Sequence, residues 1–143
     1  MKIRLIVLFL LLVIVISCKQ PDVENPSPEY VGTWKGINIE ILPGVFCDVE
    51  LILTESNYTI NLYEANGGIV LLFNSAMGTH AEELPADTVI TLNQTHVYDG
   101  VTWNVNPAIR YTEYSITNNI MDFKYDYNHP HDAWDIVDQL IKQ

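Results

Sequence analysis

Cysteine is scarce in this chain of 143 residues, which contains only Cys18 and Cys47. A small secreted domain held together by several disulfide bonds is therefore excluded. Cys47 lies in a segment whose alternate residues are apolar, so we expect it to be buried as an unreactive thiol. A reactive or intermolecular thiol at Cys47 is the alternative, although no neighbour in the sequence would obviously lower its pKa.

Basic residues are also few, with seven lysines and arginines against 18 aspartates and glutamates. The formal net charge is −11, and it would be −13 without residues 1–17, which contain two basic residues and no acidic one. Such a surface repels nucleic acid and anionic lipid headgroups. It suits a solvated domain outside the cytoplasm, or a protein that meets a basic partner.

The sequence also lacks the common catalytic and cofactor-binding motifs. It contains no G-x-S-x-G, no phosphate-binding loop, no C-x-x-C and no H-E-x-x-H. No nucleophile, base and orienting group can be recognised together. We therefore expect a protein that is not an enzyme and that needs no cofactor.

The chain has one long apolar run, and it lies at the start. Lys2 and Arg4 precede an unbroken apolar segment at residues 5–16, which is shorter than the roughly 20 residues that a membrane-spanning helix needs. The residues that follow, Val15-Ile16-Ser17-Cys18, resemble the bacterial lipobox. The resemblance implies a signal peptide at residues 1–17, cleavage before Cys18, and attachment of lipid to Cys18. An ordinary signal peptide with an incidental cysteine is the alternative.

Residues 18–29 contain three prolines among polar residues and show no periodicity, so we expect a flexible tether to the lipid. Lys19 stands where lipoproteins retained in the inner membrane of enteric bacteria have an aspartate. The expected location is therefore the bacterial cell envelope, with the protein anchored in the outer membrane.

Residues 30–143 are expected to form one folded domain of the all-β class. Alternating apolar residues and turn signals such as Asn66-Gly67-Gly68 and Asn118-Asn119 predict about eight antiparallel strands in an up-and-down barrel. Pro107 is expected to end one strand, and Asp99-Gly100 marks either a bulge or a short hairpin. The expected strands are residues 34–42, 45–54, 58–63, 69–73, 88–93, 97–105, 111–117 and 120–127.

Two further segments depart from the strand pattern. Residues 75–87 form its longest interruption and are expected to be a loop. Residues 133–142 are expected to form a short C-terminal helix capped by Asp132. The apolar stripe of that helix would consist of Trp134, Val137, Leu140 and Ile141.

The stretch Tyr30-Val31-Gly32-Thr33-Trp34-Lys35-Gly36 resembles the lipocalin signature, a G-x-W sequence at the first strand, as in small bacterial lipocalin-like lipoproteins. The resemblance implies that Gly32 and Trp34 form the barrel floor and that a late basic residue packs over the tryptophan. Arg110, the only arginine after residue 17, and Lys124 are the candidates for that cation. The resemblance also implies a barrel that binds a small apolar or amphipathic ligand.

Four aromatic residues on apolar faces are candidates to contact such a ligand, although packing of the core would explain them equally well. They are Tyr58, Tyr114, Phe123 and Tyr125. A barrel completely filled by its own side chains is the alternative, since several bulky residues are expected to point inward. These are Ile39, Leu51, Leu53, Ile60 and Phe123.

Histidines offer the remaining candidate chemistry. His129 and His131 form an H-x-H pair that, with Asp126 or Asp132, would suit zinc or copper. Pro130 between them favours a solvated loop without metal. His80 and His96 are expected at the surface.

These patterns favour a lipid-anchored, non-enzymatic envelope protein whose barrel binds a small apolar or amphipathic ligand. Two alternatives remain open. One is an acidic protein-binding module such as a lysozyme-inhibitor-like lipoprotein, and the other is a structural surface lipoprotein.

Overall fold

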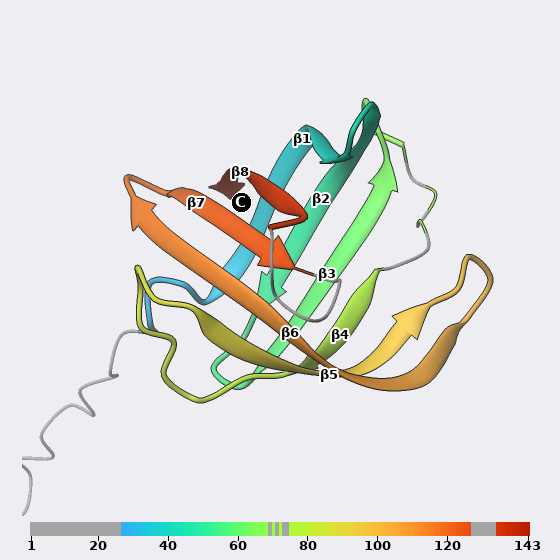
Figure 1. The fold of residues 1–143 in the computed structure, drawn as a ribbon. Coiled ribbons are helices and arrows are strands. Elements are labelled where there is room, and N and C mark those ends of the chain that lie inside the picture. Colours follow the sequence, from blue (N-terminus) through green and yellow to red (C-terminus); the bar gives the residue numbers. More distant parts are fainter. Residues whose placement is uncertain (1–26, 69, 71, 73–74, 127–133) are drawn as a thin grey trace, which may run out of the picture.

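The computed structural model describes residues 27–68, 70, 72, 75–126 and 134–143. Eight antiparallel strands form a closed barrel in which each strand pairs with the next along the chain and β8 pairs with β1 (Figure 1). The described residues contain no helix, and so none that is long and apolar enough to cross a membrane. The strands are β1 (Gly32–Leu42), β2 (Val45–Leu53), β3 (Asn57–Glu64), β4 (Ala76–Thr79), β5 (Ile90–Tyr98), β6 (Trp103–Thr117), β7 (Ile120–Asp126) and β8 (Ile136–Lys142).

The alternating sequence pattern places one face of each strand in the barrel interior. The expected inward faces of β3, β7 and of β2 from Cys47 onward are confirmed, because every second residue there is buried, whereas Val45 at the start of β2 is exposed. The Asn118-Asn119 turn is also confirmed, and both asparagines have the positive φ that a two-residue hairpin turn requires. The buried residues on these three faces are Cys47, Val49, Leu51, Leu53, Tyr58, Ile60, Leu62, Met121, Phe123 and Tyr125.

Strand β1 departs from strict alternation at a β-bulge. Gly36 pairs with Val49 and Ile39 pairs with Cys47, so two residues of β1 lie opposite one residue of β2. Ile39 is therefore buried while Ile37 is 73% exposed. Strict alternation from Ile37 to Ile39 would place both isoleucines on one face, but the extra residue inverts the order of the two faces.

The expected C-terminal helix is wrong: residues 136–142 form β8. This strand pairs with β7 over six residues and with β1 over two, which closes the barrel. Ile136 and Leu140 face inward and are fully buried, whereas Val137 and Ile141 lie outside and are exposed. Because both faces of β8 carry apolar residues, the sequence does not show the two-residue period of a strand. Pairing with the otherwise open edges of β7 and β1 outweighs the local helical pattern.

The middle of the chain also differs from the expected strands. Residues 76–79, expected in a loop, form β4, while Val70 and Leu72 make backbone hydrogen bonds with Glu64 and Leu62 of β3. The rest of the expected strand at 69–73 lies outside the described residues. Asp99-Gly100 makes a hairpin between β5 and β6, as one of the two interpretations predicted.

Pro107 does not end a strand. It lies within β6, opposite an irregularity between Gln94 and His96 of β5, and before the pairing of β6 with β7 begins at Tyr111. Proline has no backbone N–H to donate. It is tolerated there because the strand is irregular at this point and pairs with a neighbour on one side only.

The end of the barrel at which β1 begins is covered by the chain between β4 and β5. The hydroxyl groups of Tyr30 and Tyr114 donate to the carbonyl groups of Glu82 and Leu84, each at 2.6 Å. His80 is buried there, and its Nε2 lies 3.0 Å from the carbonyl oxygen of Thr54. The expected surface position of His80 was therefore wrong, because strand β4 draws the residue against β3.

Candidate functional site

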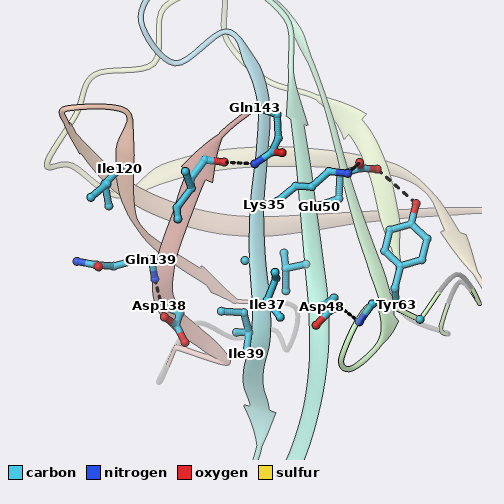
Figure 2. Close-up of a pocket in the computed structure, with 15 residues that line it drawn as sticks. Lys35, Ile37, Ile39, Asp48, Glu50, Tyr63, Ile120, Asp138, Gln139 and Gln143 are labelled. Carbon is cyan, nitrogen blue, oxygen red and sulfur yellow. Dashed lines mark hydrogen bonds and ion pairs between the residues drawn. The ribbon is translucent and has the colours of Figure 1, made fainter.

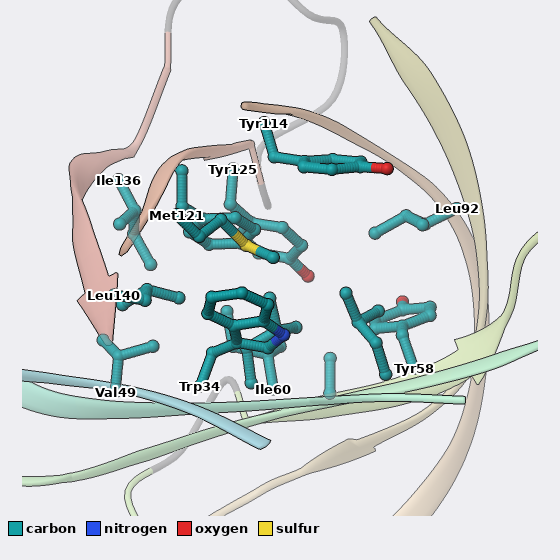
Figure 3. Packing of buried hydrophobic residues seen from close by; sticks show 14 of the residues in the cluster. Trp34, Val49, Tyr58, Ile60, Leu92, Tyr114, Met121, Tyr125, Ile136 and Leu140 are labelled. Atoms are coloured by element: carbon teal, nitrogen blue, oxygen red, sulfur yellow. The ribbon is translucent and has the colours of Figure 1, made fainter. Parts of the chain in front are cut away.

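The four aromatic residues expected to contact a ligand are all buried inside the barrel. Figure 3 shows Tyr58, Tyr114 and Tyr125 packed with Trp34 and the aliphatic core residues around them. The rings of Phe123 and Tyr125 are stacked, with their centres 6.1 Å apart. These side chains contribute to the core, which was the alternative explanation for them.

The largest side chains leave little space between them at one end of the interior. A void of about 10 Å³ lies there, lined among others by Leu84, Leu92, Tyr114 and Phe123. Such a volume is at the lower limit for one water molecule. A ligand would enter this part of the barrel only if core side chains moved.

The cation that packs over Trp34 is Lys142, which also lies beside Gly32. The Lys142 Nζ lies 5.1 Å from the centre of the Trp34 ring, and the two residues are register partners on β8 and β1. A Cβ at Gly32 would lie 2.9 Å from the Lys142 Cε, so the absence of a side chain at Gly32 makes room for the lysine side chain. The Trp34 Nε1 donates to the carbonyl oxygen of Tyr30 at 2.8 Å.

The two cations expected over Trp34 lie elsewhere. Lys124 forms an ion pair with Glu113 and lies 5.9 Å from the ring centre of Trp134. Arg110 donates from Nε to the Oε1 of Gln94 at 2.9 Å, on the β5–β6 wall. The sequence did not indicate Lys142 because the expected helix separated this residue from β1.

Arg110 belongs to a polar group inside the barrel wall. Gln94 is buried and its Nε2 donates to the carbonyl oxygen of Asn106 at 2.6 Å, so both ends of its amide are used. Burial raises the pKa of Tyr58 to about 12, although the positive charge of Arg110 acts in the opposite direction. Gln94 therefore holds the guanidinium group in place, while burial keeps the Tyr58 phenol protonated.

A spacious concavity lies on the outside of the barrel, where β8, β1, β2 and β3 meet. This outer groove has a volume of about 900 Å³ and is open to solvent (Figure 2). Its lining mixes isoleucines, carboxylates and amides. The lining residues are Lys35, Gly36, Ile37, Ile39, Asp48, Val49, Glu50, Tyr63, Gly67, Gly68, Ile120, Asp138, Gln139, Ile141 and Gln143.

The outer groove exists because β1 and β8 separate shortly after they pair. Only Trp34 and Lys35 of β1 have register partners on β8, and the bulge begins directly after Gly36. A Cβ at Gly36 would lie 2.7 Å from Leu140 Cδ2 and 2.8 Å from Ile39 Cδ1. Those two side chains thus fill the space beside Gly36, while the backbones of β1 and β8 diverge beyond it.

Asp48 fixes the shape of one side of the groove. Its Oδ1 accepts the backbone N–H groups of Asn38 and Asn66 at 2.8 and 3.2 Å, and its Oδ2 accepts that of Gly67 at 2.6 Å. Burial is the largest single effect and raises the pKa of Asp48, but the three backbone donors together outweigh it and lower the pKa overall. One carboxylate therefore stabilises both the bulge of β1 and the turn after β3.

Glu50 organises the neighbouring part of the groove wall. It accepts a hydrogen bond from Asn61 and one from the hydroxyl of Tyr63, and it lies 3.1 Å from the Nζ of Lys35. Partial burial raises the pKa of Glu50, but these polar partners outweigh burial and lower it. The groove wall is therefore preorganised by bonds within the protein.

Asp138 lines the groove, although the sequence pattern placed it on the expected helix. It pairs with the buried Phe123 on β7 and so occupies an inward position of β8, yet its side chain is exposed. The opening between β1 and β8 gives this carboxylate access to water. The order Ile136, Asp138, Leu140 would have shown a charge among inward residues, had the segment been interpreted as a strand.

Apolar side chains complete the groove. Ile37, Ile120 and Ile141 are all exposed and line it from three different strands. Ile120 and Ile141 are register partners, so their side chains are close neighbours on the outer face. Several exposed isoleucines beside a concavity are typical of a surface that binds another molecule.

No group of three or more histidine, cysteine, aspartate or glutamate residues suited to a metal occurs among the described residues. His129 and His131, with Asp132, lie outside them, as does Cys18. Cys47 is buried and free, and burial raises the pKa of its thiol to about 11, with the charge of Asp48 adding to this effect. The expected buried thiol is thus confirmed.

Comparisons of the chain with protein-family models, curated proteins and solved structures find no match.

Proposed function

We propose that this chain is a lipid-anchored, non-enzymatic protein of the bacterial cell envelope that binds a basic partner protein in its outer groove. Lipid on Cys18 would hold it at the outer membrane, and the barrel would be of the lipocalin-like kind. The anchor is supported by the lipobox resemblance at residues 15–18. The lipocalin-like fold is supported by the closed meander of eight strands and by the cation over Trp34.

The observation that carries the binding proposal is the contrast between the interior and the outer wall. The four residues first considered for a ligand inside the barrel are core residues, and the void beside them is about 10 Å³. The outer groove offers about 900 Å³ and exposed isoleucines. These features favour the protein-binding alternative over the small-ligand one.

Charge indicates the kind of partner. The chain carries a net charge of −11, and the groove contains three carboxylates, those of Asp48, Glu50 and Asp138, against one lysine, Lys35. A basic partner would be attracted over a distance of about one Debye length, and binding would weaken as salt is added. The isoleucines would then supply apolar contact in the centre of the interface.

The experiment that tests this proposal is photo-crosslinking in the native envelope. Ile37 in the groove is replaced by p-benzoylphenylalanine, and Val89, which is exposed but outside the groove, is replaced in a control variant. We expect Ile37 to yield a crosslink to a basic protein that Val89 does not yield. Absence of a crosslink specific to Ile37, or a small lipid retained by the purified chain in native mass spectrometry, would contradict the proposal.

A second measurement examines the electrostatic part. Asp138→Asn removes a groove carboxylate, whereas Glu82→Gln removes an exposed carboxylate elsewhere. Association of the crosslinked partner should be slowed several-fold at low salt by the first variant only. If both variants slow association equally, the partner recognises overall charge and not the groove. Lysozyme is a basic protein with which the narrower inhibitor alternative can be tested directly.

A further inference from the structure

The hairpin of β5 and β6 extends beyond the barrel. In β6, residues 111–117 pair with β7, whereas residues 103–105 and 108–110 have register partners on β5 only. On the β5 side, His96 and Val97 at the base of the hairpin pair with β4. Figure 1 shows this hairpin projecting from the barrel wall at the end opposite the start of β1. We call residues 96–109 the β5–β6 arm.

The arm exposes apolar side chains to an unusual degree. Val101 at the turn is 85% exposed, Val105 is 78% exposed and Ile109 is 46% exposed. Tyr98 and Trp103 are register partners, and their ring centres lie 5.6 Å apart. Because Val105 is two residues from Trp103, the valine and the aromatic pair lie on the same face of the hairpin.

The arm is also nearly free of charge, in contrast to the rest of the chain. From residue 88 to residue 109 the only aspartate, glutamate, lysine or arginine is Asp99. Its carboxylate accepts the N–H groups of Val101 and Thr102, each at 2.9 Å, and the Asn104 amide at 2.7 Å. This one charge is therefore used to shape the turn.

We infer that the β5–β6 arm docks on the lipid surface of the membrane to which the chain is anchored. Tyrosine and tryptophan beside exposed aliphatic side chains are suited to the boundary between headgroups and acyl chains. The arm offers a basic protein only one carboxylate to bind. A lipid surface without net charge needs no carboxylate, so the lack of charge favours lipid. The acidic remainder of the chain disfavours anionic lipid, so the expected surface is zwitterionic.

The proposed anchor is compatible with this arrangement. Residues 18–29 lead from the lipid to the start of β1, and twelve residues span at most about 40 Å when extended. A barrel lying lengthwise on the membrane would place both the start of β1 and the arm on the same surface. The identity of the membrane rests on the proposed lipid anchor. The affinity of the arm for lipid depends only on residues 96–109.

The test uses the full lipidated chain in phosphatidylcholine vesicles that contain brominated lipid, which quenches tryptophan at the membrane interface. We expect quenching that is lost in Trp103→Phe and retained in Trp134→Phe. The double variant Val101→Glu/Val105→Glu should also lose it, whereas Ile37→Glu/Ile141→Glu, which places two charges in the outer groove, should retain it. Circular dichroism of each variant confirms that the barrel is folded.

Quenching that Trp103→Phe does not reduce would overturn the inference, and so would quenching unaffected by the two glutamates in the arm. If Cys18 carries no lipid, the anchor in the proposed function fails. The same quenching measured with excess vesicles then still tests the arm, so the two failures are distinguishable.

Discussion

The ammonium group of Lys142 lies over the ring of Trp34 and thereby joins the last residue of β8 to the third residue of β1. The same ammonium group donates to the carbonyl oxygen of Glu29 at 2.7 Å, and the N–H of Gln143 donates to Thr33 at 2.9 Å. Because β1 and β8 share only two register pairs, these contacts contribute much of the closure of the barrel.

Removing the cation over Trp34 should weaken this closure. We expect Lys142→Met to lower the free energy of unfolding by about 1 kcal/mol, since it keeps most of the apolar stem but loses a cation–π contact and one hydrogen bond. Lys142→Arg should retain most of the stability. Urea unfolding followed by fluorescence measures both, and equal stability of the methionine variant and the parent would contradict the assignment.

Asp48 should contribute stability that depends on pH. Asp48→Ala leaves three backbone N–H groups to solvent and should cost about 1–2 kcal/mol at pH 7. Because the pKa of folded Asp48 lies below its ordinary value of 3.8, its contribution is complete above that value and is lost as the pH falls below it. The stability difference between parent and variant should therefore shrink between about pH 4 and pH 2. A difference that stays constant over this range would show that the charge of Asp48 is not involved.

Cys47 should be almost inert while the barrel is folded. A thiol whose pKa is raised to about 11 has little thiolate at pH 8, and the side chain is fully buried. We expect Ellman's reagent to react at least about 100-fold more slowly with the folded chain from residue 19 than with the same chain in guanidinium chloride. Comparable rates would indicate an accessible thiol. The Cys47→Ser variant measures the background reaction of the reagent.

Two buried tyrosines should make the protein sensitive to alkali. Burial raises the pKa of Tyr58 and of Tyr114 to about 12, from an ordinary value of 10. Their contribution to stability is complete below pH 10 and is lost as the pH rises from 10 to 12, because the unfolded chain releases these protons first. Tyr58→Phe should reduce the slope of stability against pH in this range, and thermal unfolding at several pH values measures it. A slope unchanged in that variant would place the alkaline transition elsewhere.

Much of the barrel could be predicted from local pattern. The inward residues of β2, β3 and β7 alternate with outward ones. These strands and the burial of Cys47 could therefore be inferred from a two-residue period. The eight-strand count agreed with the structure although two of the strands, β4 and β8, were not among those expected. β5 and β6 each combine segments that the sequence pattern had divided at Thr95 and at Pro107.

The candidate site could not be predicted in the same way. The outer groove depends on where β1 and β8 separate, and this follows from the bulge after Gly36 and from the packing of Leu140 beside it. Asp138 became a groove residue only because residues 136–142 form a strand. The aromatic residues on β3, β6 and β7 were recognisable, but their alternation indicates burial and does not distinguish a ligand cavity from a filled core.

The sequence by itself determined that this is an acidic, all-β chain with short turns and with a cysteine on a buried face. Composition and the two-residue period act locally and leave few other structures open. The tertiary structure decided which residues close the barrel, which cation lies over Trp34, and where the outer wall opens. Those outcomes depend on register between strands that are distant in the chain, such as β1 and β8, and register is fixed only when both strands pack against the same core.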